Sequence, residues 1–142
     1  MYIRLRPATI KDATVLLEWK NDPTMRKFSI KTHDEIKLED HLKWLEKHLS
    51  EIYIIEDADN LLYDGIAYGD IRFEGDEIAI KLDPKFRGAG IGSRALHLAM
   101  KMKKHLVAKI VNGNIASMNL FTSCGFKFKS YEDGYYVLEY NQ

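Results

Sequence analysis

The 142-residue chain contains one cysteine, carries no net charge and has no long apolar run. A single cysteine cannot form an internal disulfide bond, which fits the reducing cytoplasm. No apolar segment approaches the roughly 20 residues of a transmembrane helix. The first residues, MYIRLRP, alternate like a strand and lack the apolar region of a signal peptide. We therefore expect a cytoplasmic protein with no membrane partner, folded as one domain over residues 1–142.

Acidic residues are missing from a long stretch, because no Asp or Glu occurs from Pro84 to Tyr131. Residues 1–83 carry 12 Lys/Arg and 18 Asp/Glu, whereas residues 84–142 carry 9 and 3. The second part is therefore basic and suits an anionic ligand. Nucleic acid is not expected, since no recognition motif accompanies Lys101, Lys103 and Lys104, which fit the solvated back of a helix.

A glycine-rich stretch, DPKFRGAGIGS at residues 83–93, is the feature around which the sequence is organised. Alternating apolar residues precede it at 78–82, as in a strand. Apolar residues at helical spacing follow it: Ile91, Ala95, Leu98, Ala99 and Met102. Gly88, Gly90 and Gly92 therefore lie on a strand-to-helix turn. Backbone N–H groups at such a helix start can bind phosphate.

Two common phosphate loops do not fit this turn. A dinucleotide-binding loop needs a third glycine where Ser93 stands and an acidic residue about 20 positions later. A Walker loop needs a Lys followed by Ser or Thr. The pattern Arg-x-x-Gly-x-Gly, formed by Arg87, Gly90 and Gly92, instead resembles the pyrophosphate loop of the GNAT superfamily of N-acetyltransferases. The alternative is a glycine-rich helix start that binds no ligand.

A second motif supports the same resemblance. Residues 114–126, NIASMNLFTSCGF, are similar to the GNAT signature Asn-x-x-(Ala/Ser)-x-x-Leu-Tyr-x-x-x-Gly-Phe, and they follow an expected strand at 107–111. The two motifs occur in the order and at about the spacing of the family. The resemblance covers residues 64–128 firmly and the N-terminal third more loosely.

The resemblance implies an α+β fold, an α/β/α sandwich of element order βααβββαβαββ. Its mixed central sheet has about seven strands with a splayed parallel pair, and about four helices. We expect strands at 2–6, 52–55, 63–73, 78–82, 107–111, 126–131 and 135–140. We expect helices from Thr9 to about 21, at 38–49, from 91 onward and at 115–124, with a polar loop at 24–35. The buried stripe of the second helix is Leu38, Leu42, Leu45 and Leu49.

The resemblance also implies acetyl-CoA as co-substrate and no metal. Its pyrophosphate would bind Arg87, Gly88, Ala89, Gly90, Ile91, Gly92 and Ser93. The backbone of Ile80, Lys81 and Leu82 would hold the pantetheine amides. Asn114 and Phe121 would complete the binding site for the CoA arm. Asn114 is equally suited to be a helix N-cap.

The chain departs from the family pattern at the general acid, because Phe121 stands where a Tyr is common and cannot donate a proton. A thiol with a pKa near roughly 8.5 leaves readily, so activity without that acid is plausible. The general base is assigned to His41 or Glu77. Asp70 and Asp83 are further carboxylates near the central strands, and each fits a solvated strand-end residue better than a catalyst.

The N-terminal part bears on the acceptor. WKNDP at 19–23, MRK at 25–27 and DHLKW at 40–44 resemble two GNAT branches. One acetylates nucleotide-linked amino sugars, as in pseudaminic-acid-type pathways, and the other acetylates ribosomal-protein N-termini. We predict that Asn21, His41 and Trp44 bind the acceptor, a small-molecule amine on an amino sugar. A peptide N-terminus, or a non-catalytic acyl-CoA-binding module, is the alternative. A monomer and a homodimer are both compatible with the sequence.

Overall fold

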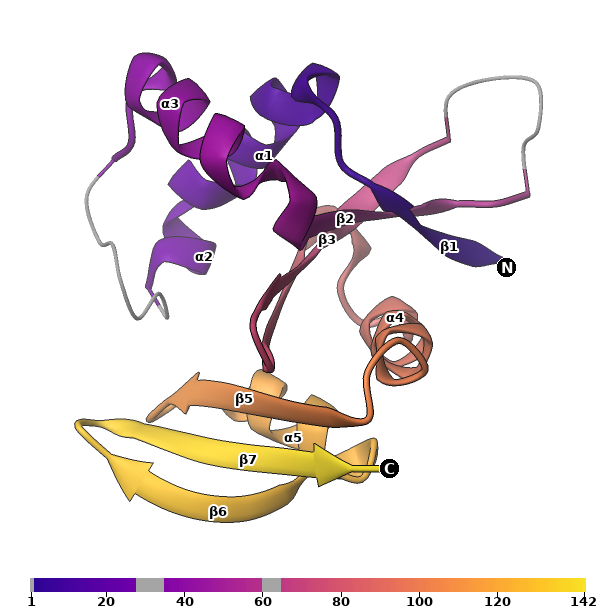
Figure 1. Ribbon diagram of the computed structural model, residues 1–142, viewed down its shortest axis with the longest axis vertical. Coiled ribbons are helices and arrows are strands. Elements are labelled where there is room, and N and C mark those ends of the chain that lie inside the picture. Colours follow the sequence, from indigo (N-terminus) through magenta and orange to yellow (C-terminus); the bar gives the residue numbers. More distant parts are fainter. Residues whose placement is uncertain (1, 28–34, 60–64) are drawn as a thin grey trace.

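The computed structural model describes residues 2–27, 35–59 and 65–142 (Figure 1). Seven strands form one sheet in the order β1-β2-β3-β4-β5-β7-β6. They are β1 (Ile3–Pro7), β2 (Ile52–Asp57), β3 (Ala67–Glu74), β4 (Glu77–Leu82), β5 (His105–Val111), β6 (Lys127–Glu132) and β7 (Tyr135–Asn141). The helices are α1 (Ala13–Asn21), α2 (Pro23–Arg26), α3 (Leu38–His48), α4 (Ile91–Met100) and α5 (Ile115–Ser123). The expected α+β fold and mixed sheet are confirmed.

Strands β4 and β5 are the parallel pair, and they separate almost at once. Their register holds a single pair of partners, Glu77 and Val107, at the start of both strands. Every other neighbouring pair of strands is antiparallel and is paired over most of its length. The sheet therefore consists of two halves, β1–β4 and β5–β7, joined at one end and open at the other (Figure 1).

Two apolar cores cover the two faces of the first half. One contains Ile71, Phe73 and Ile78 of β3 and β4, packed with α4 and with residues of α5 and β5. The other contains Ile52 and Ile54 of β2, packed with α1 and α3. Because side chains alternate across a strand, residues of β3 next to Ile71 and Phe73 face α1 and α3.

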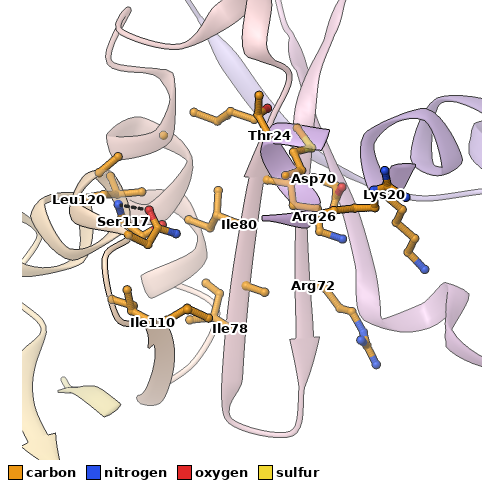
Figure 2. A pocket seen from close by; sticks show the side chains of 18 of the residues that line it. Lys20, Thr24, Arg26, Asp70, Arg72, Ile78, Ile80, Ile110, Ser117 and Leu120 are labelled. Atoms are coloured by element: carbon orange, nitrogen blue, oxygen red, sulfur yellow. Dashed lines mark hydrogen bonds between the residues drawn. The ribbon is translucent and has the colours of Figure 1, made fainter. Parts of the chain in front are cut away.

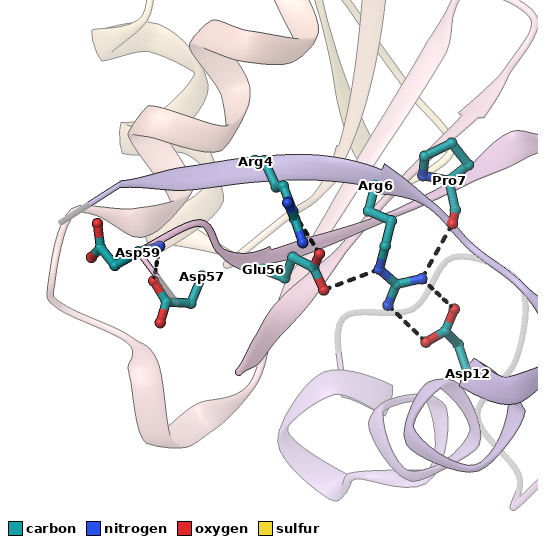
Figure 3. Close-up of polar contacts among 7 residues, drawn as sticks. All are labelled: Arg4, Arg6, Pro7, Asp12, Glu56, Asp57 and Asp59. Carbon is teal, nitrogen blue, oxygen red and sulfur yellow. Dashed lines mark hydrogen bonds and ion pairs between the residues drawn. The ribbon is translucent and has the colours of Figure 1, made fainter. Parts of the chain in front are cut away.

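A partly buried ion-pair network fixes the start of α1 against the sheet (Figure 3). The buried carboxylate of Glu56 on β2 pairs with Arg4 at 2.7 Å and with Arg6 at 3.0 Å. Arg6 also reaches both carboxylate oxygens of Asp12, at 2.9 and 3.0 Å. Asp12 accepts from the backbone N–H of Thr9, which is one of the two reciprocal contacts of a capping box. This network sets the position of α1 over β2 and β3.

Several predicted boundaries differ from the structure. The predicted loop 24–35 begins with helix α2, because Asp22 accepts hydrogen bonds from Thr24 and Met25 and Pro23 occupies the first helical position. The predicted helix after the glycines ends at Met100, and Met102 is 44% exposed. Residues 28–34 of that loop and residues 63–64 of the expected third strand lie outside the described residues.

The buried stripe of α3 also differs from the expectation. Leu38, placed at its first residue, is 51% exposed, whereas Leu45 is fully buried. His41, one turn after Leu38 along α3, is also buried, because it lies under α1. The face of α3 that packs against α1 is therefore shifted from the predicted leucine stripe toward His41 and Trp44.

Candidate active site

The glycine turn has the geometry of an anion-binding loop. Gly88 and Gly90 have φ of +83° and +78°, a region that favours glycine, and a Cβ at either position would meet no atom within 4 Å. Gly90 is the N-cap of α4, and Arg94 N–H to Gly90 O is the first bond of the helix. The N–H groups of Ile91, Gly92 and Ser93 therefore have no helical partner. The loop fits a phosphate group.

Strand β4 leaves its outer edge free where it separates from β5. Beyond Glu77, no described residue of β5 pairs with β4, so its outward N–H and C=O groups along Ile78–Leu82 remain available. On the inner edge β3 comes very close, since a Cβ on Gly69 would lie 2.0 Å from Lys81 O. Only glycine permits this approach. The free edge suits an extended amide chain such as pantetheine.

A cavity of about 970 Å³ joins the glycine loop, the open edge of β4, and helices α1–α3 (Figure 2). All predicted cofactor residues except Ala89 and Ile91 lie on its wall, and so do His41, Trp44 and Glu77. Asn21 does not. Its amide instead bonds in both directions with the backbone of Ile36, at 2.8 and 2.7 Å, and holds the chain ahead of α3.

The residues of the second motif lie on the far side of this cavity. Asn114 is the N-cap of α5, and its Oδ1 accepts from Ser117 N–H at 3.3 Å. Phe121 is 4% exposed and packs edge-on against Phe126, with ring centroids 5.0 Å apart. Position 121 thus provides a cavity wall without a hydroxyl group.

The three carboxylates named from the sequence have different environments. Glu77 lies 3.2 Å from Lys109 Nζ, and Asp83 accepts from Trp19 Nε1 at 3.1 Å and caps the turn at Lys85. Asp70 is only 6% exposed, so the expectation of a solvated strand-end residue was wrong. Burial raises the pKa of Asp70, although the nearby cations Lys81, Lys20 and Arg72 oppose the shift.

His41 is held between α3 and α1. Its side chain is 1% exposed, and Nε2 donates to Ala13 O at 3.1 Å. The other nitrogen, Nδ1, is therefore an acceptor in this tautomer, and it is buried without a hydrogen-bond partner. Burial, followed by the charge of Lys20, lowers the pKa of His41. The ring is neutral at pH 7 and keeps one free lone pair.

The ring of Trp44 has cationic side chains lying over it, so it does not present an open face to the cavity. Lys20 Nζ lies 3.0 Å from its ring centroid, the guanidinium carbon of Arg72 lies 4.9 Å away, and the His48 ring stacks at 4.5 Å. Sequence reasoning missed Lys20 and Arg72. The available signal was the run Asp70-Ile71-Arg72-Phe73-Glu74, which alternates charged and apolar residues and predicts one polar face of a strand.

Within the ranges 2–27, 35–59 and 65–142, no group of three His, Cys, Asp or Glu side chains is arranged to hold a metal ion. The helices of these ranges are all too short or too polar to cross a membrane.

Known proteins share this architecture. An uncharacterized protein of Methanocaldococcus jannaschii is 27% identical over 135 residues, which cover 88% of this chain and 28% of that protein, so the chain spans little more than a quarter of its length. A domain from the same organism has a TM-score of 0.86 at 26% identity, over 99% of both chains. Spermidine N-acetyltransferase from Vibrio cholerae, solved with CoA and spermine, has a TM-score of 0.81 at 14% identity, over 99% of this chain and 95% of its own.

The model of the acetyltransferase (GNAT) domain matches residues 3–127, most of the chain. That range contains the glycine loop, the splayed strands and the second motif. Members of this family transfer an acetyl group from acetyl-CoA, and the loop of this chain fits the phosphate groups of that co-substrate. The chain therefore belongs to the acetyltransferase (GNAT) domain family.

Proposed function

We propose that the protein transfers acetyl directly from acetyl-CoA to the primary amine of a small molecule, an amino sugar or a nucleotide-linked amino sugar. The observation that carries this proposal is the shared cavity of about 970 Å³. This volume is in the upper part of the range found for small-molecule binding sites. One end is formed by the phosphate loop, and the other end by the polar side chains of α1, α3 and β3.

The residues on the cavity wall have separate roles in this proposal. Acetyl-CoA supplies the thioester. The N–H groups of Ile91, Gly92 and Ser93 bind its pyrophosphate, and the free edge of β4 orients the pantetheine arm. Phe121 cannot protonate the leaving thiolate, which needs little help because a thiol has a pKa of about 8.5.

Deprotonation of the amine is assigned to the acceptor end of the cavity. His41 Nδ1 has no hydrogen-bond partner among the described residues, and Asp70 lines the same cavity with its pKa raised by burial. Glu77 remains a candidate from the sequence, but its carboxylate is already paired with Lys109 Nζ at 3.2 Å. Three cations near Asp70 also disfavour an ammonium ion, so an amine beside them is neutral more readily.

The small-molecule acceptor is supported by the walls of the acceptor end, to which α1, α2 and α3 each contribute residues. The structural neighbour from Vibrio cholerae binds spermine, a small amine, in a chain of the same fold. A ribosomal-protein N-terminus is the competing acceptor, and it would need a wider groove for several peptide residues.

Release of free CoA from acetyl-CoA tests the proposal across a panel of amino sugars, nucleotide-linked amino sugars, polyamines and N-terminal peptides. We expect amine-dependent release with an amino sugar and the highest kcat/KM in that class. Faster release of CoA with peptides would instead assign the protein to the branch that acetylates protein N-termini. Tight CoA binding with no release from any acceptor would instead support a non-catalytic CoA-binding module.

A further inference from the structure

A strip of charged side chains lies on the face of β3 and β4 that is turned toward α1 and α3. Asp70 and Arg72 are two residues apart on β3 and therefore share a face. Lys81 on β4 is the register partner of Asp70, and directly opposite residues in an antiparallel pair also share a face. Lys20 of α1 lies against this strip, and Figure 2 shows Lys20, Asp70 and Arg72 on the same side of the cavity.

Two of the three cations in this cluster have no ion-pair partner within the part of the chain that the structure describes. Lys20, Arg72 and Lys81 all act on the carboxylate of Asp70. Neither Lys20 nor Lys81 forms an ion pair with a carboxylate of the described residues, and Lys20 instead contacts the Trp44 ring. Arg72 reaches Glu51 and Glu74 only through Nη2, at 3.5 and 3.6 Å. Its Nε is buried without a hydrogen-bond partner.

Partly buried positive charge that lacks a paired carboxylate is costly unless an anion compensates it. The protonation of Lys20 reflects this cost, because burial, and then the charge of Lys81, lower its pKa to about 7. The same environment acts on His41, whose pKa is lowered by burial and by Lys20 and Lys81. The acceptor end of the cavity therefore repels cations and attracts anions.

We propose that Lys20, Arg72 and Lys81 form a subsite that binds an anionic group, a phosphate or a carboxylate, on the acceptor molecule. The inference rests on the proposed function and narrows its substrate class to amines that also carry negative charge. A guanidinium and two ammonium groups can donate several charge-assisted hydrogen bonds to such oxygens. The subsite differs from the CoA phosphate site, which the N–H groups at the start of α4 supply.

Binding of the anion raises the pKa of Lys20, because an opposite charge favours its protonated form. At pH 8 Lys20 is mainly neutral before binding, so the complex takes up a proton from solution. His41 remains neutral at that pH, since its pKa lies below the ordinary value. Asp70 is the other group able to take up a proton, because its pKa is already raised by burial.

Titration calorimetry on the CoA-saturated protein tests the subsite without requiring turnover. The probes are glucosamine 6-phosphate against glucosamine, and L-serine against L-serinamide, so that each pair differs in one anionic group. We expect at least one pair to show tenfold or greater preference for the anion, and the pair that responds identifies phosphate or carboxylate. Lys81→Met and Arg72→Gln should remove the preference, whereas Lys43→Met, at an exposed lysine of α3 outside the cavity, should keep it.

Proton uptake provides a second readout, measured at pH 8 in two buffers of different ionisation enthalpy. Lys20→Arg should retain the preference, because the charge is kept, and should lose the uptake. Equal affinity within both pairs, or displacement of CoA by the phosphate probe, would overturn the inference. Turnover of neutral amines would meanwhile leave the proposed acetyltransferase function intact. Full uptake in Lys20→Arg would exclude Lys20 from the subsite and also count against it.

Discussion

His41 combines a structural hydrogen bond with a free acceptor nitrogen, and a single substitution separates the two. In the His41→Gln variant the side-chain amide can still donate to Ala13 O, but the ring lone pair at Nδ1 is lost. If Nδ1 accepts the proton of the amine, kcat/KM for the acceptor should fall by about 10²–10⁴-fold. Acetyl-CoA affinity and Tm should change little. Unaltered acceptor kinetics would leave Asp70 or Glu77 as the base.

Lys20 makes stability depend on pH. Its pKa is about 7 in the folded protein and 10.5 in an ordinary environment, so between these values the unfolded chain binds more protons. The free energy of unfolding therefore rises with pH through this window. Lys20→Met should raise Tm at pH 7 by about 2–4 °C, a modest shift because the side chain is partly exposed to solvent. Thermal unfolding at pH 7 and 9.5 should show this advantage shrinking at the higher pH.

If position 121 faces the CoA sulfur, as the family pattern implies, its side chain determines whether the protein can protonate the leaving group there. Phe121→Tyr adds one hydroxyl group to a ring that lines the cavity and packs against Phe126. We expect equal or higher turnover, up to about tenfold, with the gain largest at low pH, where a proton donor is most useful. The pH profile of kcat measures this. Loss of activity in a folded variant would mean that the ring edge points away from the reacting sulfur.

At the scale of elements, a substitution at the start of α4 should weaken CoA binding without unfolding the protein. Gly90→Val places a branched side chain where no atom lies within 4 Å, and where the phosphate is expected. We expect CoA affinity to fall at least a hundredfold. Gly134→Val, in the β6–β7 turn, is the matched control, because it has a similar φ of +86° and equally open surroundings. Calorimetric CoA binding that is equal in both variants would refute the assignment of the loop.

The secondary-structure elements also show which features of the fold and site could be predicted from the sequence. The glycine loop and Asn114 belong to contiguous motifs, so their places on helix starts follow from local spacing alone. The charged cluster could not be predicted in this way, because the burial of Asp70 depends on α1, β3 and β4 packing together. The exposure of Leu38 has a similar origin. The pattern of α3 contains two adjacent stripes, and the packing against α1 buries one residue of each, Leu45 and His41.

The whole molecule is two half-sheets joined by one pair of partners, Glu77 and Val107, with a cavity between them. A ligand that bonds to the free edge of β4 should therefore couple the halves. We expect CoA at 100 times its Kd to stabilise the protein by about 2.7 kcal/mol. Hydrogen exchange should slow at the outward amides of Ile78–Leu82 and at the start of α4, while β6 and β7 change little. The same experiment on Gly90→Val should show no added protection. Protection confined to α4 would mean that the pantetheine arm does not lie along β4, and that the two halves move independently of the ligand.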